Sequence, residues 1–116
     1  MSDKNSDKNS DKNKDGIEIL NHLYKVIASR RGADPSESYT AKLYDRGPGQ
    51  IAKKVGEEAV EVAMALLAET PKEVIEESAD LMYHLFVLWA QAGVKPDDVW
   101  AELKRRDGSA GLADRK

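Results

Sequence analysis

Three observations predict an all-α fold. Apolar residues recur at spacings of three and four along most of the 116-residue chain, which is the period of an amphipathic helix. Gly or Pro stands at the breaks between these segments, as is typical where helices begin and end. No segment alternates apolar and polar residues in the way that is typical of a half-buried strand. We therefore expect one helical domain over residues 16–107.

Composition narrows the class of protein. Hydrophobic residues make up 41% and charged residues 34% of the chain, as in soluble domains. The net charge of −3 gives no reason to expect a nucleic-acid partner. Cysteine is absent, which excludes disulfides and thiolate metal sites and agrees with a cytoplasmic location. The longest apolar run, residues 81–90, is about half of a membrane span, so no membrane association is expected.

Both ends of the chain are expected to lie outside the domain. Residues 1–15 repeat Ser-Asp-Lys-Asn three times and lack the apolar segment of a signal peptide. Such a polar tract cannot bury enough surface to offset the entropy lost on ordering. We predict a disordered, low-complexity tail there, and a frayed C-terminal tail over residues 108–116.

Two helices are predicted in the first half of the domain. Residues 17–31 have helical spacing and end in two Arg and a Gly, a typical helix end. A short helix should begin at residue 34, where Asp-Pro-Ser-Glu resembles a helix start, or at residue 38, and end near residue 45. The hydroxyls of residues 38–40 could hold a phosphate at that start. From the residues alone, simple capping is the favoured alternative.

Three more helices are predicted after a Gly-Pro-Gly break. The first is expected over residues 49–68. Thr70-Pro71 resembles a capping-box start for the next helix, which should end at Gly93. The last is expected over residues 96–107, with acids in its first turn and cations in its last. Residues 81–90 are apolar nearly all round, so a second face of that helix needs cover from a homodimer or a tight intrachain bundle.

Carboxylates on the two central helices form the candidate site. Residues three apart on a helix share a face, with roughly 5–6 Å between Cβ atoms, which pairs Glu58 with Glu61 and Glu77 with Asp80. Glu58 falls inside or at the edge of an apolar stripe that comprises Ile51, Val55, Ala59, Val62 and Leu66. Buried-facing acids are costly unless paired or metal-bound. If the two faces meet, oxygen ligands favour Mg²⁺, with Mn²⁺ as an alternative, over zinc.

Two residues beside these acids have open roles. Lys54 lies one turn before the first acidic pair; it either forms an ion pair there or reaches a substrate phosphate that shares the metal. His84 lies four residues beyond Asp80. It is either a core histidine or a group that contacts substrate, and the residues alone do not favour one of these alternatives.

The acidic pattern resembles that of a known group of enzymes. Glu57-Glu58-x-x-Glu61 followed by Glu77-x-x-Asp80 is similar to the EExxE…ExxD pattern of the all-α nucleotide pyrophosphohydrolases, the MazG-like group. EExxE by itself is a weak signal, because exposed helices often contain it. The second acidic pair makes the resemblance specific.

Within that group, three segments are similar to the phosphoribosyl-ATP pyrophosphatase family of histidine biosynthesis. They are Ser-Tyr-Thr at 38–40, Lys-Val-Gly-Glu-Glu at 54–58 and Asp-Leu-x-Tyr-His-Leu at 80–85. The similarity covers about residues 17–106. It implies hydrolysis of phosphoribosyl-ATP to phosphoribosyl-AMP and pyrophosphate, with magnesium. It also implies a bundle of the all-α NTP pyrophosphatase type, completed by homodimerisation, as a dimer or a multiple of dimers.

The resemblance also implies roles for individual residues. The metal ligands would be Glu58, Glu61, Glu77 and Asp80. Catalytic roles fall to Glu57 and Glu58, with Glu57 activating water or serving a second metal ion. Substrate contacts fall to Ser38, Thr40, Lys42, Lys54 and His84.

Two other functions are weighed against this one. A MazG-like or dUTPase-like hydrolase of (d)NTPs would use the same chemistry, and only residues 38–40 and 83–85 separate it from the first function. A non-catalytic helical dimerisation module would use none of it. In that case metal would not raise thermal stability, and Glu58→Gln would be neutral or stabilising because it relieves repulsion.

Overall fold

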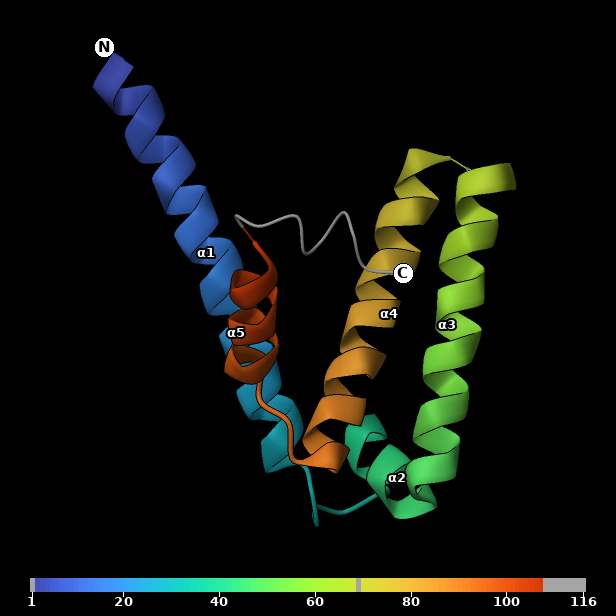
Figure 1. The fold of residues 1–116 in the computed structure, drawn as a ribbon. Coiled ribbons are helices and arrows are strands. Elements are labelled where there is room, and N and C mark those ends of the chain that lie inside the picture. Colours follow the sequence, from blue (N-terminus) through green and yellow to red (C-terminus); the bar gives the residue numbers. More distant parts are fainter. Residues whose placement is uncertain (1, 69, 108–116) are drawn as a thin grey trace.

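The protein, described here by a computed structural model over residues 2–68 and 70–107, is built from helices alone in that part of the chain. The helices are α1 (Ser2–Ser29), α2 (Tyr39–Arg46), α3 (Pro48–Ala68), α4 (Pro71–Ala92) and α5 (Pro96–Arg106) (Figure 1). The all-α prediction is confirmed, and the bounds of α2 to α5 agree closely with the predicted ones. No helix in the described ranges is long and apolar enough to cross a membrane.

The structure differs most from the sequence prediction at the start of α1. The helix begins at Ser2, so residues 2–15, for which we expected a disordered tail, continue it and project away from the other helices (Figure 1). The tract contains no Pro, and extending an existing helix is far easier than nucleating one. The tail expected over residues 108–116 lies outside the described residues.

Two predicted helix starts form differently from their patterns. Asp34 does not begin α2; its Oδ1 accepts hydrogen bonds from the backbone N–H and the hydroxyl of Ser36, which makes a local turn. The helix begins one residue after Ser38, whose Oγ accepts from Ala41 N at 3.1 Å. Thr70 precedes α4 in extended conformation, but its side chain makes no capping hydrogen bond, so the expected capping box does not form.

The antiparallel pair α3 and α4 is the frame for the rest of the molecule (Figure 1). α4 ends where predicted, at Gly93, which adopts φ 75°. Glycine favours this left-handed conformation because it has no Cβ. α2 packs against α3, and α1 packs against α4.

The core lies where these four helices meet. Its buried members are Ile27, Leu43, Ile51, Phe86, Val87 and Ala90. The ring of Phe86 stacks on Trp89 with 4.8 Å between centroids, and Trp89 meets Trp100 of α5 edge-on. The aromatic residues Phe86 and Trp89 therefore pack in and against the core.

The inner face of α3 differs from the predicted stripe. Ile51 is buried as expected, but Leu66 is 74% exposed and Ala59 is also exposed. Glu58, predicted inside or at the edge of the stripe, is buried, and so is Ala65. The face turned towards α4 is thus rotated from the apolar stripe, and this rotation places the Glu58 carboxyl inside the helix pair.

Candidate metal and active site

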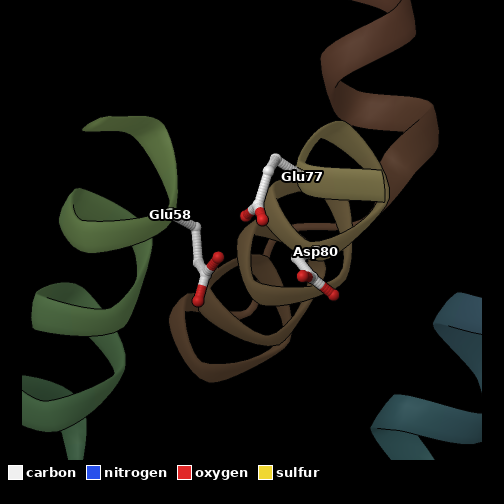
Figure 2. Close-up of side chains that lie close together, drawn as sticks. All are labelled: Glu58, Glu77 and Asp80. Carbon is white, nitrogen blue, oxygen red and sulfur yellow. The ribbon is translucent and has the colours of Figure 1, made fainter. Parts of the chain in front are cut away.

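Three carboxylates from α3 and α4 converge between the helices. Figure 2 shows Glu58 of α3 facing Glu77 and Asp80, which lie one turn apart on α4. One carboxylate oxygen from each residue lies within 4.8 Å of the other two. Three of the four acids expected to meet at one point therefore do so.

Two of the carboxylate oxygens are buried without partners. When the carboxyl groups are ionised, Glu58 Oε2 and Glu77 Oε2 accept no hydrogen bond from any described residue, and Glu58 is only 7% exposed. Leaving a buried polar atom unsatisfied typically costs about 1–3 kcal/mol. A divalent cation that coordinates these oxygens would remove that cost, and an all-oxygen donor set suits Mg²⁺ or Mn²⁺. The residues present therefore fit a metal site.

The pKa values of two cluster carboxyls also fit a site for a cation. Hydrogen bonding with Glu61, which needs a shared proton, is the main cause that raises the pKa of Glu77 to about 7, and burial and neighbouring carboxylates add to it. Burial is the main cause that raises the pKa of Glu58, while His84 and Lys54 oppose the rise. Burial and neighbouring carboxylates thus favour the protonated forms of Glu58 and Glu77.

Glu61 occupies the rim of this cluster. Its side chain is exposed, and it is absent from the set of three whose oxygens converge. It still lies close enough to Glu58 and Glu77 for carboxyl–carboxyl hydrogen bonds. The structure thus brings three of the four predicted ligands together and leaves Glu61 beside them.

Lys54 bridges the cluster and Glu57. Its Nζ lies 3.5 Å from Glu57 Oε2 and 3.7 Å from Glu58 Oε1. Glu57 is exposed and also lies 3.8 Å from the Nζ of Lys53. The ion-pair alternative for Lys54 is therefore realised in this structure, and its contact with a phosphate stays a prediction.

His84 is buried and fully hydrogen-bonded. Its Nδ1 donates to the backbone carbonyl of Asp80 at 2.8 Å, and its Nε2 lies within hydrogen-bond distance, 3.2 Å, of the Tyr39 hydroxyl. The bond to Asp80 connects His84 to the turn of α4 that carries the carboxylates. This geometry agrees with a core histidine that also orients the site, so a contact between His84 and substrate stays a prediction.

The hydroxyl residues at the start of α2 have structural partners. Ser38 caps the helix, as the simpler of its two interpretations expected. Thr40 is buried and its Oγ1 hydrogen-bonds with the hydroxyl of Tyr83. The side chain of Lys42 is exposed and forms no ion pair with the described residues.

Sequence reasoning singled out the segments 38–40 and 83–85 but did not predict that a tyrosine from each meets the other. Tyr39 and Tyr83 connect α2 to α4 through hydrogen bonds to His84 and Thr40, and their rings stack with 6.2 Å between centroids. Spacing along the chain could not show that they meet.

Fold and site together define an all-α protein with a cluster of carboxylates between two antiparallel helices. The family model described as phosphoribosyl-ATP pyrophosphohydrolase matches residues 20–107. The phosphoribosyl-ATP pyrophosphatase of Rhodospirillum rubrum is 61% identical over 97 residues, covering 84% of this chain and 83% of the relative. Its namesake from Paramagnetospirillum magneticum is 59% identical over 99 residues, covering 85% and 91%. The chain belongs to the phosphoribosyl-ATP pyrophosphohydrolase family.

Proposed function

We propose that this protein hydrolyses phosphoribosyl-ATP to phosphoribosyl-AMP and pyrophosphate in histidine biosynthesis. The observation that carries the proposal is family membership over a region, residues 20–107, that contains the whole carboxylate cluster. Relatives with the name phosphoribosyl-ATP pyrophosphatase match 84–85% of the chain. A cytoplasmic location belongs to the same proposal.

We further propose that Glu58, Glu61, Glu77 and Asp80 hold Mg²⁺, with Mn²⁺ as the alternative. The two buried, unpartnered oxygens and the raised pKa of Glu77 support this assignment. When bound, the cation would neutralise phosphate charge and orient a water molecule. Glu61, at the rim, can join the ligand set through a change of rotamer because its side chain is exposed.

The chain's own residues account for the remaining chemistry. Hydrolysis forms a bond from a water oxygen to phosphorus and breaks the anhydride P–O bond between the α- and β-phosphoryl groups, so that pyrophosphate leaves. Glu57 is the proposed general base that accepts the proton from water, because its carboxylate is exposed beside the cluster. Lys54 would exchange its carboxylate partners for a substrate phosphate. The other proposed substrate contacts are Ser38, Thr40, Lys42 and His84.

We propose a homodimer that forms through α3 and α4. These two helices expose large apolar side chains, which are Val60, Met64, Leu66, Leu67, Ile75 and Met82. Exposed apolar surface of this kind is typical of association sites. A second copy would supply the cover that the sequence predicted for the second face of α4.

Pyrophosphate release from phosphoribosyl-ATP tests the proposed function. The purified chain should release pyrophosphate with Mg²⁺, and a chelator should abolish release. The Glu58→Gln variant should lose activity, while Glu76→Gln, an exposed acid on α4 outside the cluster, serves as the matched control. Turnover that persists in chelator would reject the metal assignment. Faster hydrolysis of a dNTP would favour the MazG-like alternative, and no hydrolysis with no metal-dependent stabilisation would favour a non-catalytic module.

A further inference from the structure

Tyr39 stands out among the exposed side chains. It is 48% exposed, and it is the one aromatic residue among the exposed large apolar side chains of the described chain. The others are aliphatic, and most of them lie on α3 and α4. An exposed ring presents a flat, polarisable face that can stack on a planar ligand.

The ring is held in place by several contacts. Its hydroxyl lies 3.2 Å from His84 Nε2, and its plane stacks on Tyr83 at 27°. Tyr83 is itself fixed by the hydrogen bond to Thr40. A ring that is already immobilised loses little conformational entropy when a ligand stacks on it. Its rigidity is the property expected of a binding surface.

The ring also lies at the edge of the carboxylate cluster. Its partner His84 donates to the Asp80 carbonyl. Tyr39 is therefore connected through His84 to the turn of α4 that carries Asp80.

We propose that the exposed face of Tyr39 is the stacking surface for the adenine ring of a nucleotide whose phosphates lie at the carboxylate cluster. The inference rests on the proposed function, since the proposed substrate joins an adenine base to a phosphate chain. Two neighbouring residues at the start of α2 then have separate roles: Ser38 caps the helix, and Tyr39 contacts the base. Stacking of a base on an aromatic side chain typically strengthens binding by about tenfold.

Binding of two matched ligands tests this assignment. α,β-Methylene-ADP carries an adenine ring and cannot be cleaved between its phosphoryl groups, and methylenediphosphonate is its base-free counterpart. Calorimetric titrations of the full chain with Mg²⁺ should show that Tyr39→Leu binds the nucleotide about tenfold more weakly but binds methylenediphosphonate within about twofold of wild type. Tyr39→Phe, which keeps the ring, should weaken nucleotide binding less than Tyr39→Leu.

A second α2 tyrosine provides the control. The hydroxyl of Tyr44 donates to the carbonyl of Ile27, away from the cluster, so Tyr44→Phe should bind both ligands as wild type does. Equal losses for both ligands in Tyr39→Leu, or equal losses in Tyr39→Leu and Tyr39→Phe, would overturn the proposal. So would failure of wild type to bind the nucleotide, or a change of molar mass in Tyr39→Leu, which would assign the ring to a subunit contact. Because neither ligand is turned over, Tyr39-dependent binding without phosphoribosyl-ATP hydrolysis would reject the proposed function alone.

Discussion

At the scale of the residue, burial changes what a carboxylate does. Glu58 and Glu76 are chemically identical, yet Glu58 is 7% exposed and Glu76 faces solvent. The buried oxygen of Glu58 has no hydrogen-bond donor among the described residues, and Glu77 shares that condition. Lys54 compensates only one oxygen of Glu58, at 3.7 Å. The cluster is therefore electrostatically incomplete, which is the property that distinguishes it from a solvated acidic face.

The first residue-scale prediction concerns loss of a cluster carboxylate. Glu77→Gln should abolish the rise in melting temperature with Mg²⁺, and should lower kcat by about 100-fold or more, because a ligand is lost. Differential scanning calorimetry with a magnesium titration, together with pyrophosphate release, measures both effects. Glu76→Gln on the same helix should behave as wild type. A Glu77→Gln variant that Mg²⁺ still stabilises would refute the ligand assignment.

The second concerns pH in the metal-free protein. The folded-state pKa of Glu77 is raised to about 7, above the unfolded value of about 4.3, so the folded state binds more protons between those values. The melting temperature of the metal-free protein should therefore fall as the pH rises from about 5 to 8.

Glu77→Gln should flatten this slope, because the titrating group is gone. An excess of Mg²⁺ should reverse it, since coordination requires deprotonated carboxylates. Thermal unfolding in chelator over that pH range makes the measurement. An equally steep slope in Glu77→Gln would contradict the pKa assignment.

At the scale of the element, the α3–α4 pair matters more than either helix. Residues 77 and 80 share a face of α4 by helical geometry alone, but the site exists only because α3 lies alongside in the right rotation. α4 is delimited by Pro71 at its start and by Gly93 at its end. These two residues set where α4 begins and ends, and therefore how far along the helix pair the acids meet.

Two glycine substitutions should have opposite effects on helix stability. Gly93→Ala places a Cβ at φ 75° and should lower the free energy of unfolding by about 1 kcal/mol. Gly56→Ala lies within α3, where nothing stands within 4 Å of the new Cβ, and should raise it by about 0.5–1 kcal/mol. Urea denaturation of both variants gives the comparison. Destabilisation by Gly56→Ala would show that another surface packs there.

At the scale of the whole molecule, one chain leaves part of its apolar surface uncovered. The core comes mainly from the end of the bundle where α1, α2, α3 and α4 meet. The exposed side chains Leu66, Leu67 and Ile75 lie near the connection between α3 and α4, with 69–80% of their surface open. A second subunit is the proposed cover.

The matching prediction concerns molar mass in solution. Light scattering should give twice the 12.8 kDa of the chain, or a multiple of that dimer. Met64→Lys, which adds a charge to the exposed apolar side chains of α3, should shift the protein towards monomer. Leu103→Lys on α5, where the native side chain is 45% exposed, is the control and should leave the mass unchanged. A monomeric wild type would rule out the homodimer.

Much of the fold follows from local rules. The bounds of α3, α4 and α5 were predictable because Pro starts and Gly ends are read from neighbouring residues. The pairing of Glu77 with Asp80 was predictable for the same reason. The start of α1 was not, because the same polar tract is compatible with disorder or with extension of an existing helix. The spacing of apolar residues placed Glu58 on the buried face of α3 correctly, but it also placed Ala59 and Leu66 there, and both are exposed.

The sequence by itself determined the helices and the acidic pairs, because each depends on residues within one or two turns of each other, and its motifs carried the resemblance to a family. Tertiary structure alone decided that Glu58 meets Glu77, that Glu61 stays at the rim, and that Tyr39 reaches His84 across 45 residues of chain. Those contacts depend on how far each helix is rotated about its own axis. That rotation is set by the packing of the whole core, which no local pattern contains.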